Sequence, residues 1–418
     1  MKYCKRCLYP ANHPLHLTFD SESVCSGCRV HEEKDRLDWA ERRQKLVELC
    51  REFKSRSGAT HDCVVPVSGA RDSHFIVHTV RKELGLNPLI VSYNMQYNTA
   101  RGIRNLAYLR TLLGCDFMSS TVSPETVKKI TRATLKLMGS IYWHCLAGQT
   151  VFPVQMAVRL KIPLIIWGAH QGCDQVGMFS HLDEVEMTRK YRKEHDLMGY
   201  EAEDLAASRL GLSSADLEPY RYPDDKEIEQ VGVRGIYLGN YIRWDSKRQH
   251  ENMIRLYNYE SAPQSRSFDT YNDVDSFVYS DVHDYIKYLK YGYGKVTDHA
   301  CREIRLRRLT RNEGIELVRE YAELKPKGLR QFLAWLEMSE EDFYGFVNAQ
   351  RDQSVWRRSS HGEWELLDSV LNHRNDDGVE KVALGKIEDC KFEPASGRKV
   401  KYTEKDYVLH ARGWQLNT

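Results

Sequence analysis

The 418-residue sequence lacks the features that mark membrane, fibrous and strongly charged proteins. It contains no apolar run of about 18 residues, and its first residues, MKYCKRCLYP, lack the apolar stretch of a signal peptide. Internal repeats and low-complexity segments are absent. Its 61 basic and 59 acidic residues leave a formal net charge of +2, so no overall field favours nucleic acid or a membrane surface. We expect a soluble, cytoplasmic protein of two or three domains, without nucleic-acid or membrane partners.

The eleven cysteines are expected to stay reduced, which favours metal binding for any that cluster. Two C-x2-C pairs, separated by seventeen residues, are formed by Cys4, Cys7, Cys25 and Cys28. This spacing is typical of a structural Zn²⁺ site closed by four thiolates. We predict that zinc stabilises an N-terminal segment with little core of its own. His13, His16 and His31 are spare ligands in principle, and we interpret them as surface histidines.

Strand-like and helix-like stretches alternate from residue 58 onward. The strand-like stretches are residues 61–68, 88–93, 116–121 and 162–168, with helical patterns between them. This alternation predicts an α/β fold, with a parallel sheet that carries helices on both faces. Ligands of such sheets bind at the carboxyl ends of the strands. One site should therefore be lined by the loops that begin at Ser68, Ser92, Ser119 and Gly168.

Three regions are predicted along the chain. Residues 1–57 hold the zinc knuckle and a charged helix from residue 31 to 57, and residues 58–260 form the α/β domain. Strand alternation stops at about residue 200, and residues 261–418 are predicted to be mainly helical. The clearest helical patterns there are 311–323, 328–337 and 339–350. The polar tail from residue 363 shows no organisation that we can interpret.

The first predicted strand leads into the loop 68–73, SGARDS, at the start of a helix. Such a loop presents backbone N–H groups and a positive dipole end to an anion, which favours phosphate. The patterns G-x4-G-K-[ST] and G-x-G-x-x-G are absent, and Pro66 stands where a nucleophile elbow needs glycine. Five of its six positions match the S-G-G-x-D-S loop, so it resembles the PP-loop ATP pyrophosphatases, which cleave ATP between the α and β phosphates.

Ala70 departs from that pattern. If position 70 requires a positive φ, alanine costs on the order of 1 kcal/mol there, and Ala70→Gly should raise ATP turnover. The alternative is that the position accepts an ordinary backbone conformation.

The chain resembles the N-acetyl sugar amidotransferases from residue 1 to about 350. Four features together carry this resemblance: the loop 68–73, the cysteine pairs, GNYIRWDSKRQ near residue 240, and KYGYGKVTDHACREIRLRRLTRNEGIELV from residue 290. Enzymes of this surface-polysaccharide family turn a sugar acetamido group into an acetamidino group. The resemblance implies a PP-loop ATP-binding domain, with ATP and Mg²⁺ as cofactors beside Zn²⁺. AMP would be transferred to the amide oxygen of an N-acetyl sugar or sugar nucleotide, and ammonia would attack the resulting imidate.

The resemblance also implies partners. The chain shows no G-x-C-x-G nucleophile and carries Lys2 where an N-terminal cysteine nucleophile would stand. Ammonia would come from a separate glutaminase subunit, through a cyclase-like subunit akin to that of imidazole glycerol phosphate synthase. We expect the isolated chain to use only free ammonium.

Site residues follow from these patterns. ATP would be held by Ser68, Gly69, Ala70, Arg71, Asp72, Ser73, Ser92, Tyr93, Asn94 and Gly168. The candidate catalytic residues are Asp72, Ser73 and His170. The Asp72 carboxylate suits Mg²⁺. His170 is alternatively an ordinary loop histidine. The diphosphate of a nucleotide-linked sugar would contact Lys295, Asp298, Arg302 and Arg305, for which a solvated basic helix is the alternative. A sugar or metal contact, or an exposed helix start, is expected at Asp183, Glu184 and Glu186.

Two other functions stay open. A tRNA-thiolating enzyme would also join zinc knuckles to this loop, but it usually needs paired catalytic cysteines, whereas the later cysteines of this chain are isolated: Cys115, Cys145, Cys173, Cys301 and Cys390. A non-catalytic assembly subunit is the other alternative, because of Ala70. The sequence does not indicate which sugar is used or whether that sugar is nucleotide-linked or lipid-linked.

Overall fold

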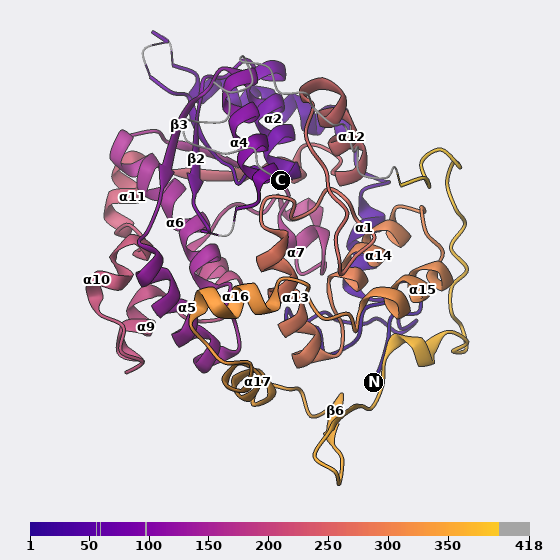
Figure 1. Cartoon of the computed structure of the whole chain (residues 1–418). Helices are drawn as coiled ribbons and strands as arrows, with labels where there is room; N and C mark the ends of the chain where they lie inside the picture. Colours follow the sequence, from indigo (N-terminus) through magenta and orange to yellow (C-terminus); the bar gives the residue numbers. More distant parts are fainter. Residues whose placement is uncertain (56, 59, 97, 393–418) are drawn as a thin grey trace.

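A five-stranded sheet forms the centre of the α/β part of this computed structural model, which describes residues 1–392 apart from residues 56, 59 and 97 (Figure 1). The strands are β1 (Cys63–Pro66), β2 (Pro88–Tyr93), β3 (Asp116–Ser120), β4 (Leu164–Trp167) and β5 (Arg234–Tyr237). They lie in the order β3-β2-β1-β4-β5, and all neighbours are parallel. The predicted α/β fold is confirmed. Strand β5 corrects the prediction that strands stop at about residue 200.

Helices make up most of the remaining structure. Up to β5 they are α1 (Ser26–Glu33), α2 (Trp39–Phe53), α3 (Arg71–His78), α4 (Ala100–Leu113), α5 (Pro124–Met138), α6 (Trp143–Leu160), α7 (Gln171–Asp174), α8 (Arg189–Tyr191), α9 (Ala202–Ala207), α10 (Ser214–Leu217) and α11 (Asp225–Val231). After β5 they are α12 (Ser246–Tyr257), α13 (Phe277–Tyr291), α14 (Lys295–Arg305), α15 (Arg311–Tyr321), α16 (Leu329–Leu336) and α17 (Glu340–Asn348). Short π-helical or 3-10 turns are Thr79–Glu83, His181–Asp183, Arg192–Asp196, Glu218–Tyr220, Leu238–Asn240 and Val370–His373.

Both faces of the sheet are covered because successive side chains of its strands point to opposite sides. On one face, Val65 and Ile90 belong to a core with residues of α2, α3 and α4. On the other face, Val64 and Leu89 belong to a core with residues of α6. Strands buried on both sides read as continuous apolar runs, which is how β2 and β4 appear in the sequence.

The strand order reverses between β1 and β4. Strand β1 pairs with β2 on one side and with β4 on the other, so the connections leave the sheet in opposite directions at this point. A crevice forms outside the carboxyl ends of the strands where the order reverses. The loop 68–73 follows β1 and the segment from Gly168 follows β4, so both border this crevice.

The region after β5 is largely helical, as predicted, and ends in a small antiparallel pair, β6 (Trp356–Arg358) and β7 (Trp364–Leu366). The N-terminal residues pack against it. Leu8 and Ala300 of α14 lie in one hydrophobic core, and the amino group of Met1 is 2.8 Å from the carboxylate of Asp368. Residues near the two ends of the described chain therefore lie side by side, as the indigo and yellow segments of Figure 1 show.

Two helices replace the single one predicted over residues 31–57. Helix α1 ends at Glu33, and α2 starts after Asp38, whose side chain accepts hydrogen bonds from the backbone N–H groups of Ala40 and Glu41. A capping aspartate satisfies N–H groups that have no partner within the helix, so it starts a new helix within a charged run. Every helix in the described range is too short or too polar to cross a lipid bilayer.

Candidate functional site

The loop 68–73 connects β1 to the first turn of α3. Ala70, the residue before the helix, has an extended conformation with φ −76° and ψ 175°. A positive φ occurs instead at Gly69, at +87°. Position 70 therefore accepts an ordinary backbone conformation, and the hypothesis that alanine strains it is wrong. The position that needs glycine is Gly69, where a Cβ atom would also lie 3.0 Å from the carbonyl oxygen of Gly102.

The loop is held together by its serines. The backbone N–H of Ser68 donates to the hydroxyl oxygen of Ser73 at 3.0 Å, and the N–H of Ala70 donates to the hydroxyl oxygen of Ser68 at 3.2 Å. Burial raises the pKa of Asp275, far along the chain, to about 7, and the nearby Ser68 hydroxyl opposes this shift. Arg71 begins α3, and its side chain lies outside the described residues.

A cavity of about 560 Å³ opens beside this loop. Asp72 lines it, together with Ala169 and residues of α7 from the other side of the crevice. The four residues predicted to bind substrate line the same cavity: Lys295, Asp298, Arg302 and Arg305. The structure thus brings Asp72 and the late glycine-rich block together, although they are far apart in the sequence.

The cationic groups of this wall already have anionic or carbonyl partners. The Nζ of Lys295 lies 2.6 Å from Asp281 Oδ1, and a guanidinium nitrogen of Arg302 lies 2.7 Å from Asp269 Oδ2. Arg305 donates to the carbonyl oxygen of Gln175 at 2.7 Å. Since Lys295 is 7% and Arg305 is 8% exposed, α14 is not a solvated basic helix. Because these cations are already paired, the wall is a poor site for the negative charges of a diphosphate. It still offers hydrogen-bond donors and acceptors to a neutral polar ligand.

Aromatic rings and histidines complete the wall. His283 stacks on Tyr142 with ring centroids 4.5 Å apart, and both residues line the cavity. Burial lowers the pKa of His283 to about 4, so this ring is neutral at pH 7. His13 is also part of the wall and is buried, which corrects its interpretation as a surface histidine. His31 is half-buried in the same wall, whereas His16 is exposed as predicted.

A second cavity, of about 190 Å³, lies at the carboxyl ends of β2 and β3 against α4. Its lining includes Ser68 and the three residues predicted to lie near adenine and ribose: Ser92, Tyr93 and Asn94. Leu106 and Phe117 give it apolar surface, which suits a flat aromatic ring. The hydroxyl of Tyr93 is turned away into the core, 2.7 Å from the hydroxyl of Tyr220, so only other parts of Tyr93 are available to a ligand.

His170 has a local structural role. Its Nδ1 accepts a hydrogen bond from the N–H of Gly172 at 3.0 Å and so caps α7. The ring is 3% exposed, packs against Tyr191 and Tyr237, and lines neither cavity. Burial lowers its pKa to about 4. Gly168 also lines neither cavity, and its carbonyl oxygen accepts from the N–H of Gly239 at 3.2 Å. A catalytic role for His170 stays a prediction.

Three acidic residues near residue 184 lie outside both cavities and have partners within the protein. Asp183 caps the 3-10 turn that it ends, Glu184 lies 3.7 Å from Arg42, and Glu186 lies 2.6 Å from Arg234. These contacts favour the structural interpretation of the three carboxylates.

The segment GNYIRWDSKRQ serves both structure and site. Trp244 and Ser246 line the larger cavity. Between them, Asp245 caps α12 and forms an ion pair with Arg308. Sequence reasoning left this segment without a function, and it also missed Asn272, Asp275 and His283, which carry no local pattern that marks a site.

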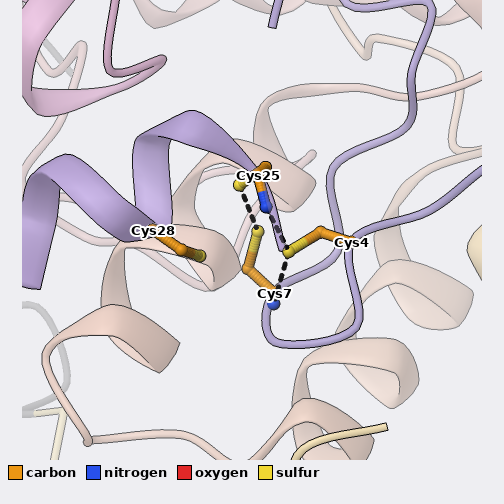
Figure 2. A group of neighbouring side chains, drawn as sticks. All are labelled: Cys4, Cys7, Cys25 and Cys28. Atoms are coloured by element: carbon orange, nitrogen blue, oxygen red, sulfur yellow. Dashed lines mark hydrogen bonds between the residues drawn. The ribbon is translucent and has the colours of Figure 1, made fainter. Parts of the chain in front are cut away.

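The four N-terminal cysteines converge on one point (Figure 2). Their sulfur atoms all lie within 4.8 Å of one another and are buried. The Cys7 and Cys25 sulfurs are 3.6 Å apart, close to the edge of about 3.8 Å that a tetrahedron with Zn–S bonds of about 2.3 Å requires. The backbone N–H groups of Cys7 and Cys25 donate to the Cys4 sulfur at 3.4 and 3.3 Å. Four buried thiol groups in this arrangement fit a metal ion such as Zn²⁺.

This cysteine cluster adjoins the larger cavity. A guanidinium nitrogen of Arg305 lies 3.6 Å from the Cys25 sulfur, while other parts of Arg305 line the cavity. A site of four thiolates and Zn²⁺ carries two net negative charges, which a buried guanidinium offsets. The predicted phosphate ligand Arg305 is therefore largely committed to the cysteines and to α7.

Comparison with known proteins identifies one part of the chain. No curated protein matches the sequence. Residues 265–371 match the family model described as "LPS biosynthesis protein WbpG-like, C-terminal domain". The matched residues include α13 to α17 and nearly half of the residues that line the larger cavity. This match supports a relation to a family of lipopolysaccharide biosynthesis proteins and suggests that the chain is an enzyme of that process.

Proposed function

We propose that this protein is an ATP-dependent amidotransferase that converts the N-acetyl group of a sugar into an acetamidino group during lipopolysaccharide biosynthesis. One observation carries the proposal. The loop that resembles a pyrophosphate-binding loop and the segment matched by the lipopolysaccharide family line one cavity, at the point where the strand order of the sheet reverses.

ATP would lie across the two cavities. The smaller one suits adenine and ribose, and Ser68 joins it to the loop, where backbone N–H groups and serine hydroxyls would hold the departing pyrophosphate. Asp72 offers a half-buried carboxylate at the larger cavity, and oxygen is the donor that Mg²⁺ prefers. Mg²⁺, when bound there, would neutralise charge on the phosphates.

The sugar would occupy the larger cavity. The charged groups of its wall already pair with one another. They can also exchange hydrogen bonds with the neutral hydroxyl groups of a sugar. The stacked pair of Tyr142 and His283 supplies a flat apolar surface against which a sugar ring can pack. We therefore assign Lys295, Asp298 and Arg302 to the sugar, and no longer to a diphosphate.

The reaction would proceed in two substitutions. The amide oxygen attacks the α-phosphorus of ATP, the bond to the β-phosphate breaks, and pyrophosphate leaves. Ammonia then attacks the imidate carbon, the carbon–oxygen bond breaks, AMP leaves with the former amide oxygen, and loss of a proton gives the amidine. The protein would orient the two substrates and exclude water, which otherwise hydrolyses the imidate back to the amide.

Thiolation of tRNA is a weaker candidate. In the described part of the chain, no cysteine lines either cavity, and burial raises the pKa of the thiols of Cys145 and Cys173. A thiol that stays protonated is a poor sulfur carrier.

The test is pyrophosphate release from ATP by the purified chain with N-acetyl sugars, free or UDP-linked, and ammonium chloride. We expect release only with an acceptor sugar, and a product lighter than that sugar by about one mass unit, as NH replaces O. Glutamine alone should not support turnover, because the glutaminase and the cyclase-like subunit are separate proteins in this proposal. Turnover with glutamine alone would contradict that part.

A further inference from the structure

Arg305, the last residue of α14, joins three parts of the structure. Its Nη2 donates to the Cys25 sulfur at 3.6 Å. Its Nη1 donates to the carbonyl oxygens of Asp174 and Gln175, at the end of α7, at 3.2 and 2.7 Å. The same guanidinium lies 5.2 Å from the centre of the Tyr9 ring, within the range of a cation–π contact. The cysteine cluster, α7 and the N-terminal segment therefore meet at one side chain.

The second cysteine pair, within residues 25–28, is shaped around this guanidinium. A Cβ atom at Gly27 would lie 2.3 Å from Arg305 Nη2 and 2.6 Å from the carbonyl oxygen of Gln175. Position 27 therefore has no room for a side chain while Arg305 keeps its place. The same segment docks on the turn that follows α7, because the hydroxyl of Ser26 donates to a carbonyl oxygen of that turn at 2.6 Å.

Two residues that Arg305 contacts also reach a carboxylate in the larger cavity. The hydroxyl of Tyr9 donates to Asp298 Oδ1 at 3.0 Å, and Gln175 Nε2 donates to the same oxygen at 3.2 Å. The other carboxylate oxygen lies 2.6 Å from Lys287 Nζ. All five of these side chains line the cavity. The contacts thus run from a cysteine sulfur, through Arg305, to the carboxylate that we assign to the sugar.

We propose that Arg305 is a positioning residue that makes the sugar-binding wall of the cavity depend on the metal in the cysteine cluster. With Zn²⁺ bound, four thiolates carry two net negative charges, which hold the guanidinium. Arg305 in turn fixes Gln175 and Tyr9 against Asp298. The planar fork of arginine suits this role, because one side chain serves a sulfur and two carbonyl oxygens at once. The consequence for the sugar rests on the proposed function, whereas the link between the cluster and α7 does not.

The first experiment measures zinc affinity of the full chain by competition with a chromogenic chelator. Arg305→Met removes both the charge and the fork, and Arg305→Lys keeps the charge alone. The control is Arg307→Met, which removes an exposed arginine nearby. We expect a loss of about 10- to 100-fold in Arg305→Met, the size typical for a group that supports metal ligands, with a smaller loss in Arg305→Lys and none in the control. An unchanged affinity of Arg305→Met, or a wild type that binds no zinc, would overturn the inference.

The second experiment follows α7 by amide hydrogen exchange in the zinc-saturated proteins. The amides of residues 173–175 are held by backbone hydrogen bonds within this turn, so they exchange when the turn opens. Both variants of Arg305 lack the fork, so exchange at residues 171–178 should be about fivefold or more faster than in the wild type, while residues 1–28 keep their protection. Exchange at the wild-type rate in residues 171–178 would overturn the inference.

Turnover separates this inference from the proposed function. Pyrophosphate release is measured with saturating ATP and ammonium chloride, and with UDP-N-acetylglucosamine or another UDP-linked N-acetyl sugar as the varied substrate. Arg305→Lys should raise KM for the sugar several-fold and keep kcat within about twofold, because a sugar contact made throughout the reaction affects binding alone. A fall in kcat with an unchanged KM contradicts the positioning role. No release by the wild type with any sugar would overturn the proposed function, while hydrogen exchange still decides the link to α7.

Gly27→Ala gives the same test if Arg305→Met does not fold. Its Cβ atom would displace the guanidinium from the cysteine pair, with the full arginine still present. This variant should also hold zinc less tightly and exchange faster at residues 171–178. Wild-type values for both would contradict the inference.

Discussion

Exchange of glycine and alanine at two adjacent loop positions tests the backbone of the site. Gly69 has φ +87° and Ala70 has φ −76°. In Gly69→Ala the left-handed conformation costs about 1–2 kcal/mol, and the new Cβ also presses on α4 at 3.0 Å from the Gly102 carbonyl oxygen. In Ala70→Gly the native conformation is unchanged, and the unfolded chain gains freedom worth about 0.4–1 kcal/mol.

Both variants should therefore be less stable in urea unfolding, but only Gly69→Ala distorts the loop. We expect Gly69→Ala to lose most ATP-dependent pyrophosphate release, and Ala70→Gly to keep the wild-type rate or fall slightly below it. Higher turnover of Ala70→Gly would refute the reasoning, because it would mean that alanine strains the loop. Wild-type stability and turnover of Gly69→Ala would refute it equally.

Three further changes test other parts of the structure. Cys28→Ser removes one of four buried thiols. If the cluster binds zinc, the variant should hold less zinc than the wild type in a metal assay and melt at a lower temperature, and an unchanged melting temperature contradicts this. In Arg266→Met the buried carboxylate of Asp284 loses the guanidinium that lies 2.7 Å from it. The loss should cost about 3–5 kcal/mol in urea unfolding, and a cost below 1 kcal/mol contradicts this. Asp275 has a pKa raised from 3.8 to about 7, so the folded protein binds more protons than the unfolded chain between these values, and stability falls as pH rises through them. Asp275→Asn should gain stability over the wild type from about pH 4 to pH 7 and keep a constant gain above pH 7, and a gain that is independent of pH contradicts this.

The sequence predicted those elements whose signals are local. The run PLIVSY became β2 with the predicted bounds, because a strand buried on both faces is apolar throughout. Helix α5 also has local signals at both ends, since Pro124 starts it and Gly139, with φ +61°, ends it. In contrast, β5 is the short segment RGIY, which becomes a strand only through its pairing with β4.

The site was only partly predictable for a related reason. The loop 68–73 has a local pattern and was identified from it. The polar segment with Asp269, Asp273 and Asp275 has the composition of a surface loop, because nothing local shows that Asp273 lines the larger cavity or that Asp269 and Asp275 are buried. Likewise, the charges of α14 suggested a phosphate site, whereas the partners that neutralise them come from other segments of the fold.

The central claim is that ATP activates the amide of an N-acetyl sugar at this cavity. The most direct measurement is the release of pyrophosphate that depends on both sugar and ammonium. It is compared between the wild type and two variants. Asp72→Asn changes a carboxylate in the cavity, and Asp183→Asn is a matched change at an exposed carboxylate outside it. We predict release by the wild type and by Asp183→Asn, strong loss in Asp72→Asn, and an amidine product lighter than the acceptor sugar. Pyrophosphate release that does not depend on the sugar, or equal release by the two variants, would contradict this claim.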